Sequence, residues 1–361
     1  MKIRVLLFPL LALTVWSCYQ VDGGKPTAIG ASGKINVILP NRLKNGPVGK
    51  VIDSIFTAQL EVFPRDEQMF TLRYVNPEDI NRSQKNIRNI IFGFTFTDQG
   101  AEAGRIKALI EPESLEALRN DTATFVHTQS NVFAKGQEIM YLFAADDKTL
   151  LKKILQNAKR LTQHFNEKER SRLRTGVIDS RSNDKLAESL AKRYGFRLNI
   201  PIGYQVADQQ TDFLWLRQIN PADDKDIWIA RRKFSSMKDF ELPNLIRFRN
   251  DVCRQYLFED PDEPETYLVT EERIASKKPV GRTVNFNSMY AVEVRGLWKT
   301  NIPSMGGPFL GYAFVDEKNG ILYYAEGFTF CPSTPQREIM RELEVILGTF
   351  AFTGRNTAKP S

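Results

Sequence analysis

The residue types that most often perform nucleophilic or acid–base chemistry are scarce in this chain, which has two histidines, His127 and His164. His127 lies in the segment TATFVHTQ and shares a strand face with Phe125, so we expect a half-buried strand residue. The alternative is a catalytic His127 with a distant serine, but the chain has no G-x-S-x-G elbow. Neither histidine has Cys, Asp or Glu at a metal-ligand spacing. The sequence therefore predicts no catalytic residue, no metal and no cofactor, and it favours a non-enzymatic protein over an enzyme.

The most reactive spacing surrounds Cys18, because a cysteine thiolate is a strong nucleophile. An apolar run over residues 5–16 precedes it, and two basic residues precede that run. The run is shorter than the roughly 20 apolar residues that span a bilayer, and it is typical of a secretory signal. Ser17 directly before the cysteine resembles the lipobox of bacterial lipoproteins, where the thiol receives a diacylglycerol. We expect a signal peptide over residues 1–17 and lipid attachment, palmitate included, at Cys18.

The residues after Cys18 bear on where such an anchor would hold the protein. Residues 18–33 contain four glycines and a proline without apolar periodicity, which predicts a flexible tether. Tyr19 is not acidic, and no run of acids follows. By resemblance to other lipoproteins, this argues against inner-membrane retention and against surface export. We therefore expect a protein anchored by lipid to the cell outer membrane, on its periplasmic face. The alternative is an ordinary signal peptide that happens to contain a cysteine.

The two remaining cysteines, Cys253 and Cys331, are candidates for a disulfide. Cys253 lies within an amphipathic helical pattern, and Cys331 ends the strand-like segment ILYYAEGFTFC. In an oxidising compartment a bridge between them would close a long loop and contribute about 4–5 kcal/mol. The alternative is two separate buried thiols, because a sequence does not show the separation of their Cα atoms.

The charge balance is basic, at +7 with a pI of about 9.2, and loss of Lys2 and Arg4 with the signal leaves about +5. An envelope location argues against nucleic acid as a partner. The charge supports a weak attraction to anionic lipid headgroups or glycans. One basic cluster is expected to be a solvated helix face, with contact to headgroups or an acidic partner as the alternative; it comprises Lys152, Lys153, Lys159, Arg160, Lys168, Arg170, Arg172 and Arg174.

The length of 361 residues exceeds the size at which single cores stop growing, so two domains are expected. Strand and helix patterns predict α+β domains over residues 34–175 and 185–353, with the polar run between them as a hinge. We expect each domain to be an antiparallel sheet covered by helices on one face. Asp146 is placed to cap a helix, and Asn319-Gly320 predicts a β-hairpin. The strand-to-helix end of the second half is similar to sandwiches of the Mog1/PsbP type.

A glycine-rich stretch in the second half is a candidate binding loop. Gly306 and Gly307 free the backbone for tight turning or for close approach to a ligand. Trp298, Met305 and Phe309 flank them and add a large apolar area. The alternative is a packed loop in a corner of the core.

Several spaced motifs resemble a Bacteroidota cell-envelope lipoprotein family of unknown function. They cover nearly the whole chain after the signal: RNI at 88–90, FAKGQEI at 133–139, Gly296-Leu297-Trp298, Met305 to Phe309, Glu326-Gly327-Phe328 and the closing RELEVILGTF. The resemblance implies a cell-envelope lipoprotein. It brings no activity and no catalytic residue.

Taken together, these features favour an outer-membrane-anchored periplasmic lipoprotein with a non-enzymatic binding or envelope-assembly role. Its expected contacts are the membrane, through the N-terminal lipid, and an envelope protein or glycan. The alternative is a hydrolase that acts on envelope glycan or peptide substrates. A lipid carrier is a third hypothesis, which would require an enclosed apolar cavity.

Overall fold

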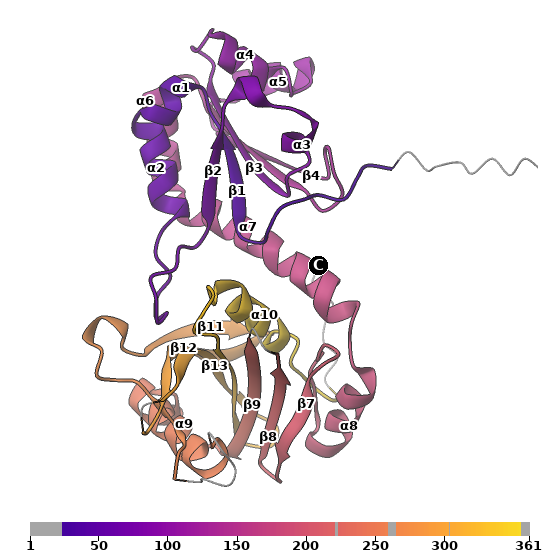
Figure 1. Cartoon of the computed structure of the whole chain (residues 1–361), viewed down its shortest axis with the longest axis vertical. Helices are drawn as coiled ribbons and strands as arrows, with labels where there is room; N and C mark the ends of the chain where they lie inside the picture. The colour runs from indigo at the N-terminus through magenta and orange to yellow at the C-terminus, as the bar shows by residue number, and fades with distance from the viewer. Residues whose placement is uncertain (1–23, 221–222, 259–264, 303, 355–361) are drawn as a thin grey trace, which may run out of the picture.

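The computed structural model describes residues 24–220, 223–258, 265–302 and 304–354. The predicted signal peptide and Cys18 lie outside the described residues. Within them the chain builds two large sheets, one from residues 34–144 and one from residues 205–330 (Figure 1). In this described part, no helix combines the length and apolar character needed to cross a membrane.

The N-terminal sheet has five strands in the order β2-β1-β3-β5-β4. Strand β1 is parallel to β2 and β3, β3 is parallel to β5, and the edge strand β4 is antiparallel to β5. The central strands β3 and β5 are buried along their whole length, as parallel strands are when both faces of the sheet are covered. The strand bounds are β1 Lys34–Ile38, β2 Thr71–Val75, β3 Asn89–Thr95, β4 Val126–Ser130 and β5 Glu138–Ala144.

Helices cover both faces of this sheet. Helices α2, α6 and α7 pack on one face and α4 and α5 on the other. Parallel neighbours require crossover connections of a dozen or more residues, and the helices lie in those connections. The prediction of an antiparallel sheet with helices on one face is therefore wrong for this half. The helix bounds are α1 Asn41–Asn45, α2 Pro47–Phe56, α3 Arg82–Lys85, α4 Ala101–Lys107, α5 Pro112–Asn120, α6 Asp147–Gln156 and α7 Ala158–Leu173.

The C-terminal sheet is antiparallel, with the order β10-β12-β13-β14-β9-β8-β7, and β11 pairs with β12. The α+β class and the antiparallel sheet of this half confirm the prediction. Asn319-Gly320 lies in the turn of the β13–β14 hairpin, as predicted, and Gly320 has a φ of 62°. The strands are β7 Gln205–Gln209, β8 Phe213–Ile219, β9 Asp224–Lys233, β10 Leu268–Thr270, β11 Val280–Phe286, β12 Met289–Thr300, β13 Gly306–Asp316 and β14 Ile321–Phe330.

Helices also lie on both faces of the C-terminal sheet, which corrects the prediction of a single covered face. Helix α10, Arg337–Leu347, packs on one face through Leu343 and Ile346. Helix α9, Leu242–Tyr256, packs on the other through Leu245 and Val252. Strands β13 and β14 are buried on both faces, so each face needs a cover. Helix α8 (Asp184–Tyr194) and a small sheet of β6 (Phe196–Arg197) with β15 (Ala351–Phe352) complete this half.

The segment predicted as a polar hinge is helical. Helix α7 extends to Leu173, and a π-helical turn, Arg174–Asp179, follows it, so a helix leads from one half to the other (Figure 1). Glu169 in this segment is fully buried, and its carboxylate accepts hydrogen bonds from Asn89 at 2.6 Å and Arg172 at 2.9 Å. The bond from Asn89, the first residue of β3, fixes α7 to the N-terminal sheet.

Glu67 joins the two halves directly. Its carboxylate accepts hydrogen bonds from the backbone N–H groups of Gln336 and Arg337 at 2.7 and 2.8 Å. These donors lie at the start of α10, where the first N–H groups of a helix lack partners within the helix. An ion pair of 2.9 Å between Arg170 of α7 and Glu344 of α10 also joins the two halves.

The predicted tether over residues 18–33 is shorter than expected at its C-terminal end. The backbone of Pro26 to Ile29 pairs with the loops that precede β3 and β5. Ala28 N–H donates to the carbonyl of Lys135 at 2.9 Å, and Lys135 N–H donates to the carbonyl of Pro26 at 2.7 Å. A further bond runs from Ile29 N–H to the carbonyl of Asn86. Low apolar content predicted a free coil, but backbone pairing needs no apolar side chains.

Candidate functional site

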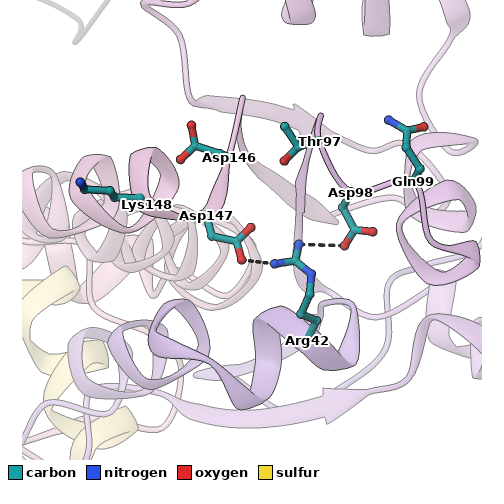
Figure 2. A pocket seen from close by; sticks show the side chains of 7 residues that line it. All are labelled: Arg42, Thr97, Asp98, Gln99, Asp146, Asp147 and Lys148. Atoms are coloured by element: carbon teal, nitrogen blue, oxygen red, sulfur yellow. Dashed lines mark hydrogen bonds and ion pairs between the residues drawn. The ribbon is translucent and has the colours of Figure 1, made fainter.

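The segments that follow β1, β3 and β5 line an open polar pocket at the carboxyl edge of the N-terminal sheet (Figure 2). Its volume is about 480 Å³. In open α/β sheets, ligands bind beyond the carboxyl ends of the strands. Position alone therefore makes this pocket the candidate site. It is lined by Arg42, Thr97, Asp98, Gln99, Asp146, Asp147 and Lys148.

Arg42 is the central charge of the pocket. Its Nη2 lies 3.0 Å from Oδ2 of Asp98, and its Nη1 pairs with Asp147 (Figure 2). Thr95, at the buried end of β3, donates its hydroxyl to Oδ1 of Asp147 at 3.2 Å. The Arg42 side chain is nevertheless 51% exposed, whereas that of Asp98 is 11% exposed. Two carboxylates thus hold the guanidinium in place, while about half of the Arg42 side chain stays exposed.

Local structure positions the acids. Asp146 caps α6 by accepting a hydrogen bond from Thr149 N–H at 2.9 Å, as the sequence predicted. Asp98 accepts a hydrogen bond from Gly100 N–H at 2.9 Å, just before α4. Its backbone carbonyl accepts a further bond from Lys107. Each acid is therefore held by the start of a helix and does not depend on a ligand for its orientation.

Arg42 and Asp98 stay charged around neutral pH. The hydrogen bond to Asp147 raises the pKa of Arg42 above its ordinary value. Burial alone would raise the pKa of Asp98, but bonds from Gly100 N–H and Arg42 outweigh it and hold that pKa below its usual range. Efficient general acid–base catalysis needs a pKa near the working pH. Arg42 and Asp98 are consequently suited to binding, not to proton transfer.

The histidines do not assemble a catalytic triad in the described residues. His127 lies on β4, with its ring centroid 6.2 Å from that of Tyr141, and its side chain makes no hydrogen bond among the described residues. His164 lies 2.7 Å from Oε1 of Glu138, and Ser130 donates to the other oxygen at 2.5 Å. In a triad the histidine bonds the serine. Here both side chains bond the carboxylate instead.

The candidate binding loop is part of the core. Trp298 pairs with Gly307 across β12 and β13, and its indole N–H donates to the carbonyl of Thr329 at 3.2 Å. Trp298 and Phe309 are 3% and 1% exposed. A Cβ atom on Gly307 would overlap the Thr329 carbonyl oxygen, so glycine is required there by close packing. The alternative of a packed corner is therefore correct, and Met305 and Gly306 belong to the same hairpin.

No bridge joins Cys253 and Cys331 among the described residues. Cys253 has a free, buried thiol in the cluster beneath α9. Cys331 is buried in the cluster on the opposite, α10 face of the sheet. The sequence left a bridge and two separate buried thiols open, because spacing along the chain does not reveal that the sheet separates the two side chains.

Three of the eight cations of the predicted basic helix face pair with carboxylates of the protein. Lys168 pairs with Glu138 at 3.1 Å, Arg170 with Glu344 and Arg172 with Glu169, both at 2.9 Å. Lys153 donates to the backbone carbonyl of Thr122. Lys152, Lys159, Arg160 and Arg174 are exposed and have no ion pair among the described residues, as expected for a solvated helix face.

Sequence reasoning did not find the pocket formed by Arg42, Asp98 and Asp147. The available signal was positional: Asp98 and Asp147 each come three residues after a continuous apolar strand. Continuous apolar strands indicate a parallel sheet, whose carboxyl edge gathers such acids. Because we expected an antiparallel sheet, the positions of Asp98 and Asp147 did not indicate a common site.

Two regions of the chain match known protein families. Residues 183–349 match a family described as Domain of unknown function (DUF4837), and residues 28–177 match Domain of unknown function (DUF8532). No curated protein matches the chain. Similar solved structures include a point mutant of the protein Mog1 and the Saccharomyces cerevisiae Ran-binding protein Mog1p. Each is 7% identical, covers 44% of this chain and 90% of its own, and has a TM-score of 0.28.

Proposed function

We propose that the protein is a lipoprotein of the cell envelope, anchored through Cys18 to the periplasmic face of the outer membrane, with a non-enzymatic binding role. The spacing of the apolar run, Ser17 and Cys18 supports the anchor. The resemblance of several motifs to a Bacteroidota lipoprotein family supports the location. The pocket at the carboxyl edge of the N-terminal sheet supports the binding role.

The observation that carries the binding role is the half-exposed Arg42 held by Asp98 and Asp147. The guanidinium offers donors, the carboxylates offer acceptors, and Gln99 and Lys148 add further polar groups at the rim. Such a mixture suits a ligand rich in hydroxyl and amide groups. We therefore propose an envelope glycan, with peptidoglycan fragments as the class to test.

The test is calorimetric titration of peptidoglycan fragments into the mature protein and two variants. Arg42→Ala should abolish binding, because it removes the central donors. Arg105→Ala is the matched control, since Arg105 is an exposed arginine on neighbouring α4 and has no ion pair among the described residues. Equal affinity of Arg42→Ala and Arg105→Ala, or no binding by any form, would reject the glycan site.

The anchor needs its own test. Cys18→Ala should move the protein from the membrane fraction to the soluble fraction, because an acyl chain supplies about 0.8 kcal/mol of membrane affinity per buried CH₂. Unchanged detergent partition would contradict lipidation.

The hydrolase alternative rests on the convergence of Ser130 and His164 on Glu138. Burial alone would raise the pKa of Glu138, but bonds from His164, Ser130 and Lys168 outweigh it and lower that pKa. Glu138 is thus a weak general base, which disfavours this reading. Release of cleaved glycan by the wild type, abolished by Ser130→Ala, would replace the binding role with an enzymatic one.

A further inference from the structure

The surface where the N-terminal segment joins the N-terminal sheet carries cations that the protein does not neutralise. Two pockets flank this segment, one lined by Lys25 and Lys135 and the other by Arg82 and Lys85. No carboxylate among the described residues pairs with any of these four side chains. In contrast, Arg172, which also lines the first pocket, is paired with Glu169.

These cations form one continuous surface. Lys25 donates its ammonium to the carbonyl of Asn131 at 2.7 Å, and Lys135 lies in the same β4–β5 loop. The Lys85 ammonium lies 5.4 Å from the ring centroid of Phe133, which is also in that loop. No residue lining the two pockets is acidic; Glu78 and Asp79 lie in the preceding turn and line neither. We call Lys25, Arg82, Lys85, Lys135, Val132 and Phe133 the anchor-side patch.

The patch lies close to the proposed lipid attachment point. Lys25 is the seventh residue after Cys18, and a fully extended chain spans at most about 3.5 Å per residue, or roughly 25 Å over these seven steps. As a coil, the same seven residues span about 15 Å. Backbone pairing of Pro26 to Ile29 prevents further lengthening from this side. An acylated Cys18 would therefore hold the anchor-side patch near the lipid headgroups. The folded protein would not be free to rotate at a distance from the membrane.

We propose that the anchor-side patch rests on the anionic lipid surface into which Cys18 inserts, so that anchor and patch together fix the orientation of the protein. This inference rests on the proposed lipid anchor. Stable anchoring takes two signals, and an acyl chain beside a basic patch is one such pair. Val132 and Phe133 are partly exposed between the cations, and apolar side chains beside basic ones insert at the boundary between headgroups and acyl chains.

The orientation has a consequence for the pocket. Pocket and patch lie at opposite ends of the same strands: β3 begins at Asn89, next to the patch, and ends at Thr95, next to Arg42. A patch against the membrane therefore leaves the Arg42 pocket facing away from it, toward the periplasmic space.

The test uses residues 19–361, which retain every described residue and lack the acylated cysteine. Binding is measured by sedimentation with vesicles of phosphatidylglycerol and phosphatidylcholine, and with vesicles of phosphatidylcholine alone. The variant Lys25→Glu/Arg82→Glu/Lys135→Glu reverses three of the four positive charges of the patch. The control Lys185→Glu/Lys278→Glu/Lys318→Glu makes the same charge change at exposed lysines of the C-terminal half, which have no ion pair among the described residues. Circular dichroism confirms that both variants fold.

We expect the unmodified chain to bind the anionic vesicles only, and the patch variant to bind them at least about tenfold more weakly than the control. Added salt should weaken the binding. Equal binding of the two variants, or no binding by the unmodified chain, would overturn the proposal. Palmitate labelling of the full-length protein reports on Cys18 independently. Labelling without vesicle binding rejects the patch and keeps the anchor, whereas vesicle binding without labelling rejects the anchor and keeps the lipid contact.

Discussion

Arg249 and Glu326 form a bidentate ion pair inside the C-terminal half, with both N···O distances at 2.8 Å and both side chains fully buried. Trp228 and Tyr324 donate to the same carboxylate at 3.2 and 3.0 Å. The ring of Phe309 lies 4.0 Å from the guanidinium. Glu326 and Phe309 belong to motifs that carry the family resemblance. Those motifs therefore mark a buried polar cluster of the core and not a surface site.

Breaking this pair should strongly destabilise the protein. Glu326→Gln removes the countercharge of a buried arginine, which costs about 3–5 kcal/mol of unfolding free energy. Urea denaturation measures the loss. Arg249→Met with Glu326→Leu removes both charges and should recover much of it. A single variant within 1 kcal/mol of wild type, on the order of an exposed pair, would contradict the structure.

Asp226 should make stability depend on pH. Burial raises its pKa to about 7, although Arg217 and the indole N–H of Trp215 favour the charged form. The folded carboxyl thus retains a proton that the unfolded chain, with a pKa near 3.9, releases. The contribution of this group to stability is therefore lost as pH rises from about 4 to 7.

Asp226→Asn removes this titration. Between pH 5 and pH 8, the stability of the variant relative to wild type should rise by about 2–3 kcal/mol. The measurement is urea denaturation of both proteins at the two pH values. Parallel pH profiles would show that Asp226 keeps its ordinary pKa.

Trp298→Ala should act on stability and leave ligand binding intact. The side chain is buried and bonded to Thr329, so its removal should cost about 3–5 kcal/mol. Trp298→Phe is the milder comparison, because it keeps an aromatic ring. Glycan titration below the unfolding temperature should match wild type for both. A selective loss of affinity in a stable Trp298→Ala protein would restore the binding-loop hypothesis.

Cys253 should resist alkylation in the folded protein. Burial raises the pKa of its thiol to about 12, so the reactive thiolate is rare at pH 8. Iodoacetamide followed by mass spectrometry should find Cys253 unmodified in native protein and modified after unfolding without reductant. Failure to react after unfolding would indicate that the thiol is bridged after all.

Local patterns in the sequence predicted the parts of the fold that depend on local physics. The Asp146 cap and the Asn319-Gly320 turn are set by a few neighbouring residues and were correct. The direction of β3 beside β5 depends on how the chain returns over the sheet, which no short window contains. The two buried runs NIIFGFT and EIMYLFA carried the signal for parallel pairing.

The candidate site was missed for the same reason. Arg42, Asp98 and Asp147 are more than 40 residues apart in sequence and meet only because three parallel strands end together. The glycine-rich stretch around Gly307 was a candidate binding loop because glycine suits both ligand approach and tight packing. Composition alone does not distinguish these two roles. Here the Thr329 carbonyl occupies the space that a ligand would need.

The hydrogen bond between Glu67 and Gln336 can form only late in the synthesis of the chain. Their positions differ by 269 residues, and a ribosome adds about 5–20 residues per second. The N-terminal half, which ends with α7, is therefore synthesised about 10–30 s before α10 is complete, and during that time Glu67 lacks the N–H groups that it binds in the folded protein. The joint between the halves is among the last parts of the molecule to form, and a chain truncated before α10 would keep that carboxylate unpaired.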